Sequence, residues 1–230
     1  MKNKLLLSIA FIATSSSAMA QSAFDGFYAQ VGIGYTNTSP TADNVTLAIK
    51  NGQYAGTYAL KSTYKSSNEL TQQITAGYMA AIDNKFLLGF GVDYDPTKGN
   101  FRDITSVGPY GTVYVWQYKV KSHFNVFLTP AYAFDKDKLI YSKIGYSQSY
   151  SEVYLEGSKN SNHIAKGYVV GLGYKQIITG GWYGFAEANY FLYPKTVQGS
   201  TGVSIRTAYT ASQEVKSSGY DVVVGVGYKF

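Results

Sequence analysis

The last twelve residues, 219–230, alternate strictly between two kinds of side chain. The even positions form a wholly apolar set with aromatic residues at both ends: Tyr220, Val222, Val224, Val226, Tyr228 and Phe230. The odd positions between them are small or charged, and they include Asp221 and Lys229. A period of two is that of a β-strand, whose successive side chains point to opposite faces. The segment therefore predicts a strand with one apolar face, which packs against either a protein core or membrane lipid.

The N-terminus carries the three parts of a secretory signal peptide. A short basic start, 1–4, precedes a largely apolar run, 5–13, and small residues follow up to Ala18-Met19-Ala20. The apolar run is shorter than the roughly 20 residues that a membrane-spanning helix needs. We therefore expect residues 1–20 to be a signal peptide that is cleaved after Ala20, and residues 21–230 to form one exported domain.

Composition favours an all-β fold. The chain has 23 tyrosines, 24 glycines and only 5 prolines, and 45% of its residues are hydrophobic, which disfavours disorder. Tyrosine suits a membrane interface because its ring is apolar and its hydroxyl is polar. The formal net charge is +6 and the basic residues are scattered along the chain, so nucleic acid is not an expected partner.

Eight segments alternate like strands when the phase is counted back from the C-terminus. They cover 24–36, 69–82, 85–94, 119–134, 139–150, 163–177, 182–193 and the terminal strand. In nearly all of them the apolar face is roughly ten residues long, which is the length that a tilted membrane strand needs. A soluble β-sandwich also alternates, but its strands are usually shorter. The pattern predicts an eight-stranded antiparallel up-and-down transmembrane β-barrel.

The connections between these segments alternate between short and long. The short ones are polar turns at 83–84, 135–138 and 179–181, and the long ones cover 37–68, 95–118, 151–162 and 194–218. Short turns at one end and long loops at the other are typical of outer-membrane barrels, with the short turns in the periplasm. We expect the alternating segments 112–116 and 203–206 to be strands that continue above the membrane.

Four features of the chain match a known family. They are the signal peptide, the segment 27–35 of the first strand, the segment Gly171–Lys175 before a tight turn, and the terminal segment Gly225–Phe230. On these features the chain resembles the small outer-membrane β-barrels of Gram-negative bacteria, the OmpA, OmpX and opacity-protein-like group. The resemblance implies a place in the cell outer membrane, among lipid and lipopolysaccharide. It also implies that Tyr228 and Phe230 form the insertion signal that the outer-membrane assembly machinery reads.

Charged side chains are predicted to point into the barrel and to form an interior charge network. They are Lys121, Lys143, Lys175, Lys229, Asp93, Glu187 and Asp221, together with His123. The interior of an eight-stranded barrel is just wide enough for side chains to fill, and a lone buried charge is very costly. We expect these groups to pair and to plug the lumen. The alternative is a narrow, charge-lined path for ions or water.

Residues for catalysis or metal binding are scarce. Neither of the two histidines, His123 and His163, is accompanied by an evident nucleophile and orienting group. The chain has no cysteine and no cluster of histidine and aspartate at metal-ligand spacing. We therefore expect no enzyme activity, no metal and no cofactor, although some barrels of this size resemble enzymes that modify lipid A.

The long loops are the expected functional surface, because loops often carry function and these are rich in tyrosine. Nine tyrosines lie in or beside them: Tyr54, Tyr58, Tyr64, Tyr110, Tyr114, Tyr118, Tyr150, Tyr154 and Tyr209. Our leading hypothesis is a non-enzymatic surface protein that supports the envelope or binds an extracellular ligand in adhesion. The alternatives are a porin-like channel for ions or small solutes and, third, a lipid-modifying enzyme.

Overall fold

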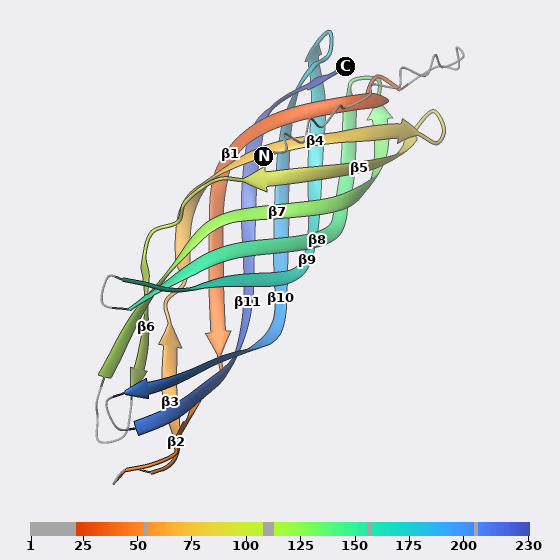
Figure 1. The fold of residues 1–230 in the computed structure, drawn as a ribbon. Helices are drawn as coiled ribbons and strands as arrows, with labels where there is room; N and C mark the ends of the chain where they lie inside the picture. Colours follow the sequence, from red (N-terminus) through yellow and green to blue (C-terminus); the bar gives the residue numbers. More distant parts are fainter. Residues whose placement is uncertain (1–21, 53–54, 108–112, 156–157, 205–206) are drawn as a thin grey trace, which may run out of the picture.

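The computed structural model describes residues 22–52, 55–107, 113–155, 158–204 and 207–230. These residues form eleven β-strands that belong to one antiparallel sheet (Figure 1). The expected signal peptide, 1–20, and its cleavage site lie outside the described residues. Within the described residues, no helix is long and apolar enough to cross a membrane.

Eight long strands close into a ring. They are β1 (Gly26–Ala42), β4 (Ser67–Ala81), β5 (Phe86–Asp95), β7 (Val113–Asp135), β8 (Lys138–Leu155), β9 (Ser158–Thr179), β10 (Trp182–Ser204) and β11 (Thr207–Lys229). Each pairs with the next, and β1 pairs with β11 to close the ring. The predicted eight-stranded up-and-down barrel is confirmed, and all eight predicted strands are present.

Three tight turns join β4 to β5, β7 to β8 and β9 to β10 at one end of the barrel, where the sequence predicts them. The last of these turns uses Gly180 at a φ of +55°, in the left-handed region that favours glycine. In the first, the Asp83 carboxylate accepts hydrogen bonds from the backbone N–H groups of Lys85 and Phe86, at 2.7 and 2.8 Å. These bonds hold the pKa of the Asp83 carboxyl below its usual value. We take this end as periplasmic.

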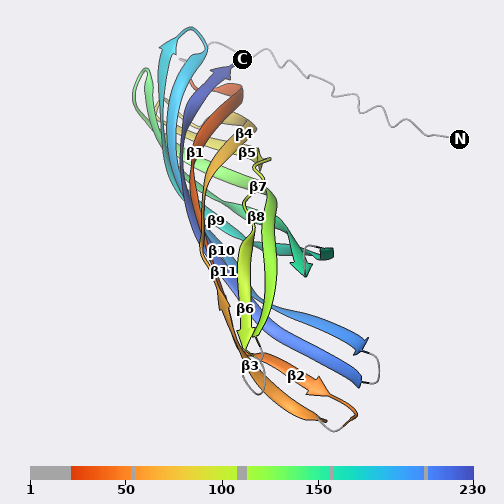
Figure 2. The same ribbon diagram turned by 90° about the vertical axis from the view of Figure 1, so that its left-hand side faces the viewer.

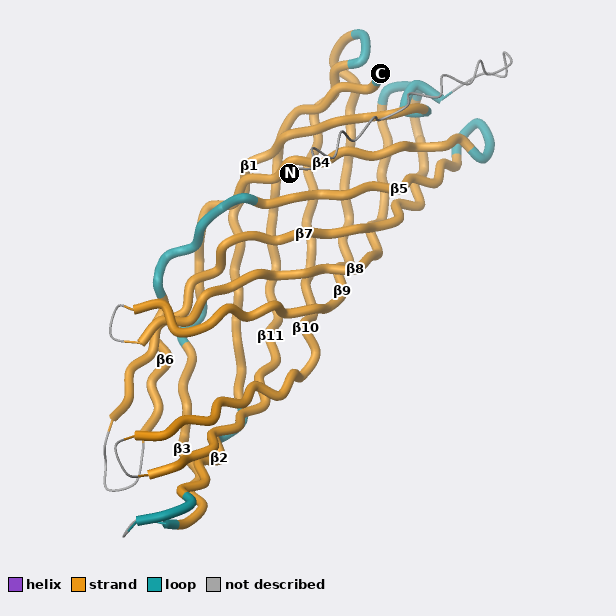
Figure 3. Tube along the Cα trace, in the orientation of Figure 1, coloured by secondary structure: helices purple, strands orange, loops and turns teal. Residues whose placement is uncertain are grey.

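The long connections at the other end are mostly strands, where the sequence predicts loops. β2 (Val45–Ile49) and β3 (Gly56–Tyr64) form a hairpin between β1 and β4, and β6 (Arg102–Val107) lies between β5 and β7. β2 pairs with β11 and β3, and β6 pairs with β3 and β7. In the extracellular wall, these three strands therefore replace β1, β4 and β5 (Figure 3).

Several long strands also run beyond the membrane, as predicted. β7 begins at Val113 and β10 ends at Ser204, so strand structure covers 113–116 and 203–204 of the segments that we expect to continue upward. Thr112 and residues 205–206 lie outside the described residues.

The outward face of the ring is an apolar belt bounded by two girdles of exposed aromatic side chains. The extracellular girdle contains Tyr35, Tyr94, Tyr146, Tyr168, Tyr190 and Tyr220. The periplasmic girdle contains Phe27, Tyr78, Phe86, Trp182, Tyr228 and Phe230. We call the region between the girdles the membrane belt. Its exposed apolar side chains would face lipid.

β9 and β10 separate above the membrane belt. They pair from Thr179 and Trp182 up to Tyr168 and Leu192. Beyond that point, β9 pairs with β8 and β10 pairs with β11, and no backbone pairing joins β9 to β10 among the described residues. The β8–β9 and β10–β11 hairpins bend to the same side of the barrel, and their ends lie apart (Figures 1 and 2). We call this break in the wall the β9–β10 gap.

Candidate functional site

Apolar side chains fill the periplasmic half of the barrel interior. One buried cluster contains Phe24, Met79, Leu87, Ala131, Ala133, Leu139 and Tyr141, and a second contains Tyr28, Tyr183, Phe185 and Val223. Phe24 precedes β1 and is only 5% exposed, so the N-terminal end of the described chain closes the periplasmic mouth. This packing therefore fills the interior of the barrel at its periplasmic end.

A buried lysine bridges two carboxylates at the centre of the membrane belt. The Lys143 Nζ atom lies 2.5 Å from Asp93 Oδ2 and 2.9 Å from Glu187 Oε1. Each of these three side chains is at most 3% exposed. We call these three residues the central ion cluster. They come from β5, β8 and β10, so the cluster ties together strands from different parts of the ring.

Neutral donors complete the central ion cluster. Asn125 donates to Asp93 at 2.5 Å, and the Gln73 amide donates to the same carboxylate at 3.0 Å. Glu187 accepts hydrogen bonds from the Tyr141 hydroxyl at 2.7 Å and from the Asn189 amide at 2.8 Å. A buried charge is tolerated when an opposite charge and hydrogen bonds replace the water that it loses, as they do for these three side chains. Alternation predicts that Tyr141 and Gln73 point inward, but it does not show which inward side chains touch, so the sequence does not predict these contacts.

Lys175 is buried among aromatic rings on the periplasmic side of the cluster. Its Nζ atom lies 3.8 Å from the ring centroid of Tyr28, 4.9 Å from that of Tyr183 and 5.4 Å from that of Tyr141. The faces of these rings stabilise an ammonium group through their quadrupoles. Asp221 is also buried and accepts a hydrogen bond from Asn189 at 2.8 Å.

The structure therefore places most of the predicted interior charges inside the barrel. Buried there are Asp93, His123, Lys143, Lys175, Glu187 and Asp221.

Lys121 and Lys229 lie outside the central ion cluster, unlike the shared network that the sequence predicts. An irregularity in the pairing of β7 with β8 between Val120 and Ser122 shifts the alternation, and Lys121 instead pairs with Glu152 at 2.9 Å. Lys229 is the last residue of β11 and is partly exposed at the periplasmic rim. The irregularity in β7 thus explains the position of Lys121, and the end of β11 explains that of Lys229.

An aromatic layer lies on the extracellular side of the central ion cluster. His123 is buried, and its ring centroid lies 5.9 Å from that of Phe191 and 6.5 Å from that of Tyr193. The Tyr193 and Ser147 hydroxyl oxygens are 2.9 Å apart and share a hydrogen bond. Val169 belongs to the same buried cluster as Phe191 and Tyr193. This layer separates the filled lumen from the space above it.

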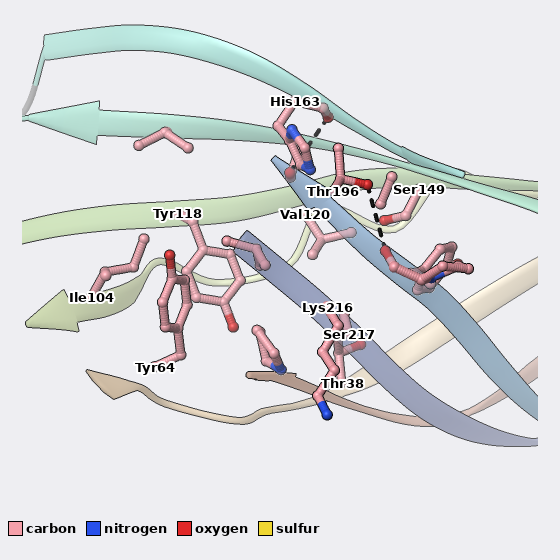
Figure 4. A pocket seen from close by; sticks show the side chains of 17 residues that line it. Thr38, Tyr64, Ile104, Tyr118, Val120, Ser149, His163, Thr196, Lys216 and Ser217 are labelled. Atoms are coloured by element: carbon pink, nitrogen blue, oxygen red, sulfur yellow. Dashed lines mark hydrogen bonds between the residues drawn. The ribbon is translucent and has the colours of Figure 1, made fainter. Parts of the chain in front are cut away.

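Above the aromatic layer is a cavity of about 90 Å³, which we call the extracellular chamber (Figure 4). Its apolar lining includes Tyr64, Ile104, Tyr118, Val120, Val153 and Val215, and its polar lining includes Ser149, His163, Thr196 and Ser217. Ala165 of β9 and Thr196 of β10 both line it, at the height where these strands no longer pair. The chamber therefore borders the β9–β10 gap.

Two of the loop tyrosines meet at the wall of the chamber. The ring centroids of Tyr64 and Tyr118 are 6.4 Å apart. The Tyr64 hydroxyl donates to the Gln213 side chain and the Tyr118 hydroxyl to the Lys65 carbonyl, both at 2.9 Å. Burial raises the pKa of each phenol to about 12, so both are neutral.

Of the nine loop tyrosines, Tyr54 and Tyr110 lie outside the described residues.

His163 lies at the polar side of the chamber, five residues beyond Tyr168 of the extracellular girdle. Partial burial lowers the pKa of its imidazole, which favours the neutral form. The Ser151 hydroxyl donates to the His163 backbone carbonyl at 3.5 Å. Among the described residues, no group of three or more His, Asp or Glu side chains is placed to hold a metal ion.

Comparison with known proteins identifies the fold. No family model and no curated protein sequence matches the chain. Among solved structures, the outer membrane protein OprG from Pseudomonas aeruginosa is 15% identical, with 90% of this chain and 96% of that one covered and a TM-score of 0.56. The chain has the fold of the small outer-membrane β-barrel proteins.

Two further solved structures are similar at lower TM-scores. The outer membrane protease OmpT from Escherichia coli is 9% identical over 94% of this chain and 100% of that one, with a TM-score of 0.49. Neisserial surface protein A is 19% identical over 90% and 98%, with a TM-score of 0.45. At these identities the likeness concerns the fold. A ring of strands with an exposed apolar belt between two aromatic girdles is the surface that a barrel of this fold turns toward membrane lipid.

Proposed function

We propose that this outer-membrane barrel takes up small, mostly apolar molecules from outside the cell. They enter the extracellular chamber and leave sideways through the β9–β10 gap into the outer membrane. The observation that carries the proposal is that the chamber lies directly beside the gap. Ala165 and Thr196 line the chamber from β9 and β10, at a height where no backbone hydrogen bonds hold these strands together.

The filled lumen supports a sideways route over a straight one. Below the chamber, a molecule would meet the aromatic layer, then the central ion cluster, and then the apolar clusters that include Phe24. A passing ion would have to displace buried groups that already have partners, which is costly. We therefore favour lateral release over the porin-like channel for ions or small solutes, and we expect no discrete conductance from the folded protein in planar bilayers.

Surface binding is a second candidate function, and the strands β2, β3 and β6 support it. They form an ordered wall beyond the membrane belt, on which an extracellular ligand or an adhesion target would find a fixed surface. In either role the protein is proposed to be non-enzymatic. We expect the mass of lipid A to stay unchanged on overexpression, and a changed mass would contradict this part of the proposal.

The end of β11 is proposed to serve assembly. Tyr228 and Phe230 are exposed, and their rings meet edge to face with centroids 5.2 Å apart. The exposure of this aromatic pair at the periplasmic end of β11 supports the proposed role of Tyr228 and Phe230 as the insertion signal that the assembly machinery reads.

A removable cross-link across the gap tests the lateral route. The chain has no cysteine, so Ala165→Cys with Thr196→Cys creates a single reactive pair, which a bismaleimide with an internal disulfide can join. We expect cells that overproduce the cross-linked variant to take up radiolabelled toluene at the background rate. Reduction of the linker should restore uptake.

The control for this experiment is Gln148→Cys with Lys166→Cys. These residues face each other on β8 and β9, so the same linker joins two strands that already pair and leaves the gap open. Uptake should then be unchanged. Rapid uptake through the variant cross-linked between β9 and β10 would rule out the gap as the route.

A further inference from the structure

The extracellular chamber has two chemically different sides. Tyr64, Ile104 and Tyr118 lie on one side, on β3, β6 and β7, and their contact depends on the pairing of these strands. His163 lies on β9, and Ser149 lies on β8 beside it in the wall. Figure 4 shows the tyrosine pair and His163 at separate parts of the lining. A bound molecule would therefore meet rings and aliphatic groups on one side and hydrogen-bonding groups on the other.

The apolar side has little hydrogen-bonding capacity to offer. The two tyrosine hydroxyl groups already donate to Gln213 and Lys65, so the tyrosines present their rings to a ligand. Ile104, on the strand between those of the two tyrosines, is only 9% exposed. This side suits the face of a small ring, because aromatic rings pack in tilted or edge-to-face arrangements with one another.

The polar side, in contrast, presents hydrogen-bonding groups to the chamber. The buried Ser217 hydroxyl has no hydrogen-bond partner among the described residues, and a buried polar group without a partner is destabilising. Ser149 lines the chamber with its hydroxyl group. The imidazole of His163 is the largest polar group there, and in its neutral form it has one nitrogen that donates and one that accepts.

We propose that the molecule taken up is a single neutral ring that carries one hydroxyl group, and that His163 is the specificity-determining residue that binds this hydroxyl. This inference rests on the proposed uptake function and narrows its substrate class. Size sets an upper limit: an apolar cavity of about 150 Å³ holds benzene, and the chamber is smaller at about 90 Å³, so at most one ring enters it and part of that ring must extend into the β9–β10 gap.

A neutral ligand fits the chamber better than an ionised one. Lys216 is the charged residue in the lining, and its charge already acts on the nearby Asp43 carboxylate. An anion would also lose its hydration against the apolar side, which is costly. The chamber therefore favours a hydroxyl over a carboxylate.

The test compares phenol with toluene, which have similar shapes but differ in the hydroxyl group. Binding to purified, folded protein in lipid nanodiscs can be measured by saturation-transfer NMR, with empty nanodiscs as the reference for partitioning. We expect phenol to bind more tightly than toluene. His163→Ala should weaken phenol binding about tenfold, the effect of one lost hydrogen bond, and should leave toluene binding unchanged.

Two variants separate specificity from general damage. His163→Gln keeps a donor and an acceptor at this position, so it should recover part of the phenol affinity. Ile104→Ala removes an apolar contact and should weaken both ligands alike. Each variant must first show the different gel mobilities of boiled and unboiled samples that a folded barrel gives.

Several outcomes would overturn the inference. Equal loss of phenol and toluene binding in His163→Ala would show that His163 affects only the shape of the chamber and does not recognise the hydroxyl. Wild-type binding of toluene at least as tight as that of phenol would remove the hydroxyl preference but leave the uptake proposal intact. Benzoate binding tighter than phenol, and lost in Lys216→Met, would point to an anionic ligand instead. If neither phenol nor toluene binds, the uptake proposal itself fails.

Discussion

Lys143 and Lys195 each bridge two carboxylates from other strands or turns, one inside the membrane belt and one outside it. Lys143 contacts Asp93 and Glu187 at 2.5 and 2.9 Å. Lys195 contacts Asp43 and Glu214 at 2.7 and 3.0 Å. The distances are similar, but the Lys143 side chain is fully buried and that of Lys195 is 51% exposed. The two clusters therefore differ mainly in their contact with water.

This difference separates the two halves of the molecule. In the membrane half, the central ion cluster is shielded from solvent and surrounded by further hydrogen bonds, so the removal of any one member leaves a buried imbalance of charge. In the extracellular half, Lys195 lies at the bulge of β10 and connects it to the β1–β2 turn and to β11, but water and salt weaken such pairs. The closed half is held by buried contacts, and the β9–β10 gap is flanked by exposed ones.

The strongest test of this comparison replaces each lysine with methionine. Lys143→Met leaves two buried carboxylates close together without a cation, so the free energy of unfolding should fall by about 3–5 kcal/mol. Lys195→Met should change it far less, because its partners stay hydrated. Urea unfolding in lipid vesicles, followed by tryptophan fluorescence, measures both. Similar losses in the two variants would show that burial does not distinguish the clusters.

A pair of glycines tests how tightly the membrane half is packed. A Cβ at Gly173 would overlap the ring of Tyr141, whose hydroxyl donates to Glu187, whereas a Cβ at Gly184 would have no atom nearer than 3.8 Å. We expect Gly173→Ala to destabilise the barrel by about 1–3 kcal/mol, as overpacking does. Gly184→Ala should be neutral or slightly stabilising. The same urea titration measures both, and equal effects would contradict a tightly packed interior.

The pH dependence of phenol binding tests the chamber. Burial lowers the pKa of His163, so its imidazole stays neutral through the usual range near 6.5 and gains a proton only at more acid pH. Phenol affinity should be constant from pH 8 to 6.5 and fall up to about tenfold below that, because the protonated ring loses its acceptor. Tyr64 and Tyr118, with pKa values of about 12, stay neutral throughout.

His163 also makes a small contribution to how folding stability depends on pH. The unfolded chain binds a proton near pH 6.5 and the folded chain does not, so this residue reduces stability as the pH falls below 6.5. His163→Gln should give a flat binding profile and should remove this contribution. A wild-type profile that is also flat down to acid pH would argue against a hydrogen bond from phenol to the imidazole.

Much of the membrane half could be predicted from the sequence, because lipid imposes a strict rule there. Each strand must turn one apolar face outward, so the alternation in each strand identifies the inward positions as well. Asp93, Glu187 and Asp221 occupy such inward positions, and the structure has them buried inside the barrel. The alternation does not give their contacts, because pairing between inward side chains depends on the stagger of the strands.

The extracellular half could not be predicted in the same way. Above the membrane no face must be apolar, so β2, β3 and β6 carry no clear pattern, and an irregularity next to Lys121 shifts the alternation without a sequence signal. The chamber depends on pairing between connections that are far apart in the chain. The tyrosine content of these connections suggests recognition, but only the pairing of β3 with β6 and of β6 with β7 brings Tyr64 beside Tyr118.

The pairing of β2 with β11 has a consequence for the order of assembly. β2 lies near one end of the described residues, and its neighbour in the extracellular wall, β11, lies near the other. The hairpin of β2 and β3 therefore lacks a neighbour on that side until β11 pairs with it, and contacts so distant in sequence form late. The outer wall is thus completed only when β11 is in place. An antibody that recognises this wall, and not its separate peptides, would report finished molecules alone.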